Sequence, residues 1–271
     1  MNFDSRELRD LLDSIRFVYG YDFTQYAEAS VKRRISHFVT NRKFEGLDAM
    51  GKAILRDEKL FEEFVRDMSV TVTEMFRDPP VYKRMRTNVM KRLATYPFIK
   101  IWIAGCATGE EVYSVAIMLS EENLLGRSVI YATDINQHSL QVAKEGVYDV
   151  EKMKEYTMNY QKAGGKRAFS EYYKAKYNSV MFDRELRTNI VFAPHNLATD
   201  KSFNEFQLII CRNVLIYFNQ QLQNRVIGLF YESLCPFGFL GLGNKESLLF
   251  SDKRKFFEEV DHKGKIFMKA E

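Results

Sequence analysis

Apolar residues recur at helical spacing through residues 1–95 of the chain. The spacing predicts a first helix that ends at Gly20, with an apolar face made of Leu8, Leu11, Leu12, Ile15 and Val18. A second helix is expected to turn four side chains inward, those of Tyr26, Ala29, Ile35 and Phe38. We therefore expect residues 1–95 to form an all-helical N-terminal domain.

The pattern changes from residue 96 onward, where short apolar runs alternate with helical stretches. The runs cover residues 100–104, 128–135, 189–197 and 206–211. Alternation of this kind is typical of a mostly parallel sheet with helices on its faces. We expect residues 96–271 to form an α/β domain that ends in a hairpin of residues 256–260 and 265–268.

One stretch interrupts the alternation. Residues 172–177 and 180–182 favour strands, and Asn178 and Ser179 between them favour a turn. These features predict a small antiparallel β-subdomain, inserted near residues 168–192.

A glycine loop follows the first run and precedes a helical stretch. It reads Gly105-Cys-Ala-Thr-Gly109, and Glu110 and Glu111 come directly after it. A strand, a glycine turn and a helix leave backbone N–H groups for a nucleotide-like cofactor, although a tight turn of any α/β domain would look the same. A dinucleotide fingerprint needs a third glycine, and the paired acids would repel a pyrophosphate. The cationic, phosphate-free S-adenosylmethionine therefore fits this loop better than NAD.

Asp134 ends the second predicted strand, where this kind of fold places an acid that accepts hydrogen bonds from a ribose diol. The alternative is an N-cap for the helix that follows. Later strands also end in polar residues, which we expect to converge with Gly105 and Asp134 at the carboxyl edge of the sheet. These residues are Asn196, Arg212, Asn213 and Tyr217.

Composition narrows the class of protein. The chain has 271 residues, 46% of them hydrophobic and 28% charged, as in an ordinary globular protein. Three widely spaced cysteines indicate reduced thiols rather than disulfides, and we see neither a membrane-spanning apolar run nor a signal-peptide pattern. We expect a cytoplasmic, monomeric enzyme without membrane insertion.

The formal net charge of +4 is modest, but residues 31–43 contain several cations and no acid. A solvated helix face is the common explanation for such a run. The functional alternative is a docking surface for an acidic partner, centred on Lys32, Arg33 and Arg34. Interleaved exposed aromatic residues, which single-strand nucleic-acid binders use, are missing from the run, so we expect no nucleic-acid partner.

Five blocks of the sequence, in order, resemble the CheR family of chemoreceptor glutamate methyltransferases. They are Thr73-Glu-Met-Phe-Arg77, residues 104–114, Ala132-Thr-Asp-Ile135, His195-Asn-Leu197 and residues 211–218. The resemblance implies a class I S-adenosylmethionine-dependent methyltransferase fold, which is Rossmann-like, with an inserted β-subdomain and an all-α N-terminal domain. It also implies methylation of glutamate carboxylates on the cytoplasmic helical bundle of chemoreceptors.

The resemblance further implies roles for individual residues. S-adenosylmethionine or its product S-adenosylhomocysteine would be bound by Thr73, Arg77, Gly105, Glu111, Asp134, Asn196, Leu197, Arg212 and Asn213. Arg77 and Tyr217 would act at the transferring methyl group and the acceptor carboxylate. The chain departs from the family pattern at Thr71, where relatives often have asparagine, and its short turn at Asn178 argues against capture of a receptor's C-terminal peptide.

The expected reaction explains which motifs are missing. A glutamate side chain, with an ordinary pKa of about 4.3, is already ionised at neutral pH, so methyl transfer needs no general base. Accordingly we identify no catalytic triad and no metal-ligand pattern among the four histidines. Two other classes remain open: a methyltransferase for another carboxylate, and a non-catalytic module that senses the cofactor.

Overall fold

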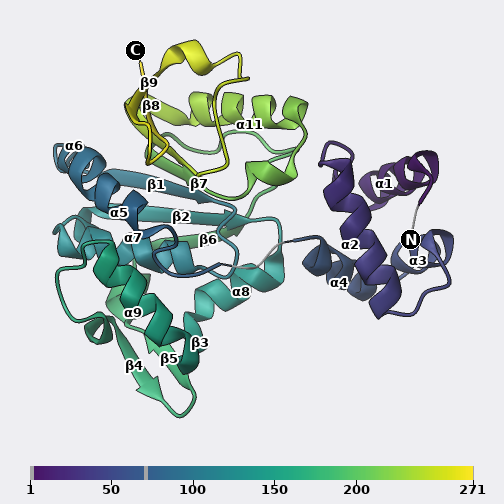
Figure 1. The fold of residues 1–271 in the computed structure, drawn as a ribbon, viewed down its shortest axis with the longest axis horizontal. Helices are drawn as coiled ribbons and strands as arrows, with labels where there is room; N and C mark the ends of the chain where they lie inside the picture. The colour runs from purple at the N-terminus through teal and green to yellow at the C-terminus, as the bar shows by residue number, and fades with distance from the viewer. Residues whose placement is uncertain (1–2, 70–72, 271) are drawn as a thin grey trace.

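A computed structural model describes residues 3–69 and 73–270 of the chain. Figure 1 shows a group of helices at one end of the molecule, beside a larger α/β domain. The helices of the N-terminal domain are α1 (Ser5–Tyr19), α2 (Glu28–Asn41), α3 (Leu47–Ile54) and α4 (Glu58–Met68). The expected all-helical N-terminal domain is therefore confirmed.

Helix α1 begins and ends where its sequence predicts. Asp4 caps its first turn, and Gly20 ends it with a left-handed φ of 76°. The expectation that Val18 lies on the buried face is wrong, because its side chain is 51% exposed. Tyr19 closes that end of the apolar face instead, with its ring stacked 3.7 Å from the ring of Phe61.

The prediction for the second helix needs a correction. Helix α2 begins only at Glu28, so Tyr26 lies before it, and Ala29 is exposed. Ile35 and Phe38 are buried as expected. Tyr26 is not helical because its backbone forms an antiparallel bridge with Phe218 of the α/β domain.

A helical segment with an internal π-turn leads from the N-terminal domain into the sheet. It consists of α5 (Pro79–Met85), η1 (Arg86–Met90) and α6 (Lys91–Leu93). Pro79 occupies the first position of α5. A backbone N–H at that position makes no hydrogen bond within the helix, so proline, which has no N–H, is tolerated there. The family departure at Thr71 lies outside the described residues.

The main sheet has seven strands in the order β6-β2-β1-β7-β8-β10-β9. Their bounds are β1 (Ile99–Ala104), β2 (Ser128–Asp134), β6 (Ile190–Pro194), β7 (Phe206–Cys211), β8 (Leu234–Leu242), β9 (Phe257–Asp261) and β10 (Ile266–Lys269). The five strands from β6 to β8 pair in parallel, and β10 pairs antiparallel with both β8 and β9. The expected parallel sheet and terminal hairpin are both present, as in a class I S-adenosylmethionine-dependent methyltransferase.

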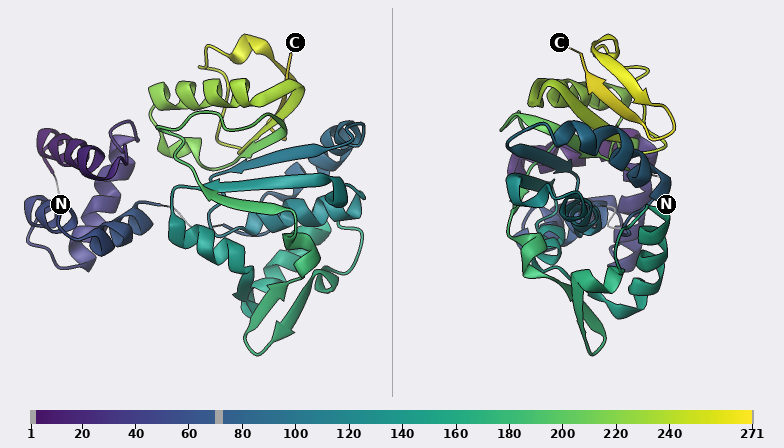
Figure 2. Two further views of the ribbon diagram at one scale, coloured as in Figure 1. Left: turned by 180° about the vertical axis from the view of Figure 1, so that it is seen from behind. Right: turned by 90° about the vertical axis from the view of Figure 1, so that its left-hand side faces the viewer.

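Apolar side chains cover both faces of this sheet, because the central strands are buried on either side. On one face, Ile101 and Ile103 pack with α7 (Glu110–Glu121) and α5. On the other, Trp102 packs with α11 (Gln220–Ser233). Helix α8 (Gln137–Glu145) packs against β2 and β6. The carboxyl ends of β1, β2 and β7 point toward the helical domain (Figure 2).

The small antiparallel sheet has the order β3-β5-β4, with β3 (Val147–Asp149), β4 (Tyr173–Lys176) and β5 (Ser179–Phe182). The hairpin is the predicted one, although its turn consists of Tyr177 and Asn178, because Ser179 already pairs with Lys176. Strand β3 was not foreseen. It is joined to the hairpin through α9 (Met153–Lys162), and the bounds of the predicted subdomain stay a prediction.

Within the described residues, none of the helices has both the length and the apolar character needed to span a bilayer.

Candidate functional site

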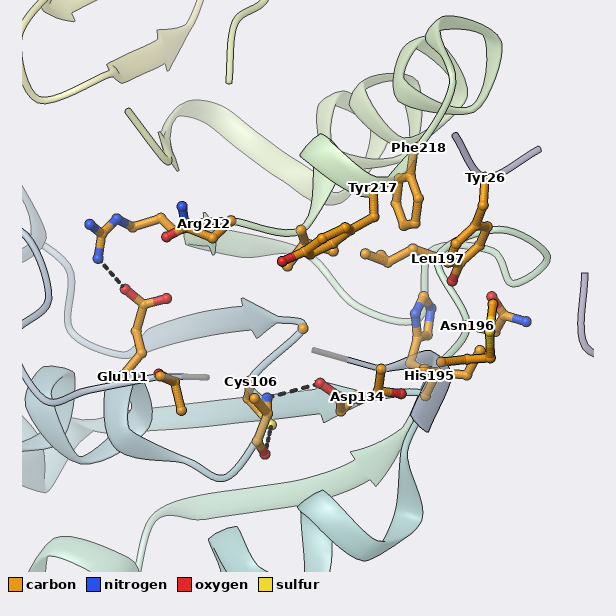
Figure 3. Close-up of a pocket in the computed structure, with 18 of the residues that line it drawn as sticks. Tyr26, Cys106, Glu111, Asp134, His195, Asn196, Leu197, Arg212, Tyr217 and Phe218 are labelled. Atoms are coloured by element: carbon orange, nitrogen blue, oxygen red, sulfur yellow. Dashed lines mark hydrogen bonds and ion pairs between the residues drawn. The ribbon is translucent and has the colours of Figure 1, made fainter. Parts of the chain in front are cut away.

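A pocket lies at the carboxyl ends of β1, β2 and β7, and the helical domain forms part of its wall (Figure 3). It is lined by every residue that was predicted to bind the cofactor or to act in catalysis: Thr73, Arg77, Gly105, Glu111, Asp134, Asn196, Leu197, Arg212, Asn213 and Tyr217. The structure thus brings together side chains that are widely separated in the chain. Their individual roles stay predictions.

We call Gly105, Glu111, Asp134 and Arg212 the floor of the pocket. They come from the three strand ends and the start of α7. We call Phe23, Tyr26, Tyr217 and Phe218 its roof. The first two roof residues belong to the helical domain, and the last two lie in and after the short helix η5 (Leu215–Tyr217).

The glycine loop closes the end of β1. The backbone N–H groups of Gly105 and Cys106 both donate to the carbonyl of Thr133, at 2.8 and 2.9 Å. Gly105 has a φ of 76°, and a Cβ there would lie 2.4 Å from Val214, so the position needs glycine. The loop is therefore fixed against β2 and close to the loop after β7.

Asp134 joins the loop to the end of β2. Its Oδ2 accepts the N–H of Ala107 at 2.8 Å, and its Oδ1 accepts the N–H of Asn136 at 2.9 Å. The N-cap of α8 is Asn136, so the alternative role for Asp134 as that cap is excluded. Burial raises the pKa of Asp134, and the backbone donors work against that rise. The oxygens retain lone pairs that can accept further bonds from a ligand.

Arg212 is a buried floor residue that lies between two carboxylates. Its guanidinium pairs with Glu111 at 2.7 Å and with Asp78 at 2.8 Å, and it also donates to the carbonyl of Arg77 at 3.0 Å. Desolvation lowers the pKa of Arg212, but the neighbouring anions outweigh it and leave the pKa above its usual range. The contacts of Arg212 with Asp78 and with the Arg77 carbonyl hold the backbone of residues 77–78 beside the pocket. Asp78 has a left-handed φ of 56° there.

Glu246 is a site residue that sequence reasoning missed. Its buried carboxylate accepts the N–H groups of Asn213, Val214 and Leu215, at 3.1, 2.8 and 2.8 Å, and that of Gly243. Burial raises the pKa of Glu246, and these four donors oppose the rise. Glu246 fixes the loop in which Asn213 adopts a φ of 61°. No local pattern in the sequence marks it, because its partners lie in a distant segment.

The roof residues from the helical domain were also missed as pocket residues. The ring of Tyr26 lies edge-on to that of Phe218, with centroids 4.9 Å apart, and edge-on to Phe23 at 5.2 Å. Only the packing of the two domains brings these rings to the pocket. The sequence carries no signal for it.

The three predicted docking cations of α2 have different surroundings. Lys32 pairs with Glu28 at 2.8 Å, and Arg33 is exposed. The half-buried Arg34 lies over the ring of Tyr217, with 5.3 Å between the guanidinium carbon and the ring centroid. The structure thus directs Arg34 toward the pocket rather than outward.

The charges of the lining residues suit a cationic ligand. Three carboxylates, Glu74, Glu111 and Asp134, face two guanidinium groups, Arg77 and Arg212. This balance agrees with a sulfonium donor and disfavours a polyphosphate. Among residues 3–69 and 73–270, no group of three His, Cys, Asp or Glu side chains is placed to hold a metal ion.

Two family models divide the chain between them. The all-alpha domain of CheR methyltransferases matches residues 6–69, and the CheR methyltransferase SAM-binding domain matches residues 71–264. The chain belongs to the CheR methyltransferase family. It is a methyltransferase with a domain that binds S-adenosylmethionine, and members of its family are named chemotaxis protein methyltransferases. The boundary between residues 95 and 96 stays a prediction.

Several relatives match over most of their length. A Pseudomonas putida protein named Cher3 is 51% identical over 97% of both chains. The chemotaxis protein methyltransferase of Listeria innocua is 33% identical over 85% of this chain and 86% of its own. That of Escherichia coli is 29% identical over 72% of this chain and 67% of its own.

Proposed function

We propose that this CheR family member transfers the methyl group of S-adenosylmethionine to glutamate side-chain carboxylates of chemoreceptors, leaving S-adenosylhomocysteine and a glutamate methyl ester. The observation that carries the proposal is the Tyr217 hydroxyl, which points into the pocket across from Cys106 and Asp134 (Figure 3). The methyl group of a cofactor bound on the floor would thus lie next to an acceptor carboxylate bound at the roof.

The floor residues fit the cofactor. Asp134 would accept hydrogen bonds from the ribose hydroxyls, and the backbone of the glycine loop would lie along the adenosyl group. Leu197 supplies an apolar surface for the base, with Asn196 next to it. Further contacts are proposed from Thr73, Arg77, Glu111, Arg212 and Asn213.

Bound S-adenosylmethionine supplies an activated methyl group, so the protein has mainly to orient the acceptor. We propose that the Tyr217 hydroxyl donates to one carboxylate oxygen and leaves the other to attack. Arg77 would steer the anion from the pocket wall, because a close pair with the attacking oxygen would weaken the nucleophile. Well-oriented reactants can lower a barrier by roughly 7–11 kcal/mol in this way.

Receptor docking is proposed for the outward cations of α2. Arg33 is exposed and Lys32 is partly exposed, so both can meet the acidic helices of a receptor's cytoplasmic bundle. These cations lie on the same helix as Arg34, whose side chain reaches the roof. A helix bound there would therefore lie near the pocket.

The proposal is tested with methyl-labelled cofactor and cytoplasmic fragments of candidate receptors. The expected product is a base-labile label, released as methanol, that is lost when the receptor's modified glutamates are changed to glutamine. Label on small carboxylic acids but on no receptor would support the second candidate, a methyltransferase for another carboxylate. Cofactor binding without turnover on any acceptor would support a sensing module.

A further inference from the structure

Tyr217 is held by the helical domain through its backbone. The N–H of Ala27 donates to the carbonyl of Tyr217 at 2.8 Å, and the N–H of Asn219 donates to the carbonyl of Gln25 at 2.9 Å. These two bonds flank the bridge between Tyr26 and Phe218. They form a short antiparallel ladder between residues 25–27 and 217–219.

The same domain also holds the ring of Tyr217. The guanidinium carbon of Arg34 lies 5.3 Å from the ring centroid, within the range of a cation–π interaction. Nη1 of Arg34 donates to the carbonyl of Asp67 at 3.1 Å, which anchors the guanidinium to the last turn of α4. The cation is thus fixed between two helices and covers one face of the ring.

Arg34 does not line the pocket itself, so it would act through Tyr217. A cation over the ring restricts the ring to one orientation. It also draws electron density from the ring, which makes the phenol a better hydrogen-bond donor to an anionic oxygen. Both effects favour the arrangement in which the hydroxyl meets the acceptor carboxylate.

We propose that Arg34 is a positioning residue for methyl transfer, which holds and polarises the Tyr217 ring, and that the helical domain thereby completes the active site. The inference rests on the proposed function of Tyr217 as the group that orients the acceptor. It separates Arg34 from its neighbours Lys32 and Arg33, whose proposed role is docking.

The test compares three variants of the full chain: Arg34→Met, Arg34→Lys and Arg42→Met. Arg42 is the matched control, because its guanidinium lies 5.8 Å from the ring centroid of Phe38, in the same domain but away from the pocket. Turnover is measured on a receptor fragment, binding of S-adenosylhomocysteine by calorimetry, and the Tyr217 ring carbon by NMR of protein labelled with 13C-tyrosine. The Tyr217 resonance is assigned with Tyr217→Phe.

We expect Arg34→Met to lower kcat about two- to fivefold, at any salt concentration, with KM for the receptor changed less than about twofold. Arg34→Lys should restore part of kcat, because it keeps the cation, and Arg42→Met should leave kcat unchanged. Binding of S-adenosylhomocysteine should stay the same in all three variants. The Tyr217 resonance should move in Arg34→Met and not in Arg42→Met.

Two results would overturn the inference. One is an unmoved Tyr217 resonance in Arg34→Met. The other is an unchanged kcat with a KM that is raised at low salt and approaches that of the unaltered enzyme as salt rises, which would make Arg34 a docking cation. If the unaltered protein methylates no receptor, the proposed function fails instead. The resonance then still decides whether Arg34 acts on Tyr217.

Discussion

The floor and the roof of the pocket are held in different ways. The floor depends on charge and backbone hydrogen bonds: Asp134 is bonded to the glycine loop, and Arg212 is buried between Glu111 and Asp78. The roof depends on aromatic contacts and on the ladder between residues 25–27 and 217–219. The floor lies within one domain, whereas two domains share the roof. Cofactor binding and acceptor orientation should therefore respond to different substitutions.

The largest effect is expected at the floor. Arg212→Met removes a buried cation and leaves the partly buried Glu111 without its partner, which should lower the free energy of unfolding by about 2–4 kcal/mol. Denaturant unfolding of the cofactor-free protein measures it. The control is Lys52→Met, which breaks an exposed pair with Asp48 and should cost less than about 1 kcal/mol. Equal losses of unfolding free energy in the two variants would contradict the expected difference between a buried and an exposed ion pair.

Asp134→Asn should weaken binding of S-adenosylhomocysteine roughly 10- to 100-fold, because hydrogen bonds to an ionised acceptor are lost. Calorimetry measures the affinity, with Asp149→Asn as an exposed control. Because burial raises the pKa of Asp134, affinity should fall with decreasing pH at a higher pH than an ordinary aspartate would give. The asparagine variant should lack that dependence. A dependence that persists in it would assign the titration to another group.

Tyr217→Phe tests the roof. It removes one hydroxyl and keeps the ring, so kcat should fall roughly three- to tenfold while cofactor affinity stays within about twofold. The control is Tyr177→Phe, at a tyrosine that is 89% exposed on the β-subdomain turn. A Tyr217 variant with weakened cofactor binding and normal kcat would reverse the roles assigned to floor and roof.

The smallest effect is expected outside the pocket. Reversal of the docking charges, Lys32→Glu with Arg33→Glu, should raise KM for the receptor about two- to fivefold at low salt and leave kcat unchanged. The difference from the unaltered enzyme should shrink as salt screens the charges. A KM that does not respond to the reversal would remove these residues from the docking surface.

Much of the floor could be predicted from sequence because its signals are local. The glycine loop and Asp134 stand at strand ends, and parallel strands bring their carboxyl ends to one edge. Arg212 and Asn213 follow the same rule. The acid pair after the glycine loop favoured S-adenosylmethionine over NAD, and the resemblance to the CheR family implied the same cofactor.

The roof and its supports could not be predicted in the same way. Tyr26 has helical spacing to Ile35 and Phe38, but its pairing with Phe218 overrides that preference. Glu246 resembles any charged loop residue until its backbone partners are known. Arg34 was predicted to belong to an outward docking surface with Lys32 and Arg33, because sequence spacing does not show which side chain of α2 meets the other domain. Contacts between distant segments decide all three.

The ladder between residues 25–27 and 217–219 has a consequence for biosynthesis. A growing chain makes the helical domain early and can fold it before the rest emerges from the ribosome. Its partner segment arrives only when most of the polypeptide has been translated. An unfinished chain thus lacks the assembled roof, so the capacity to orient an acceptor arises late in translation.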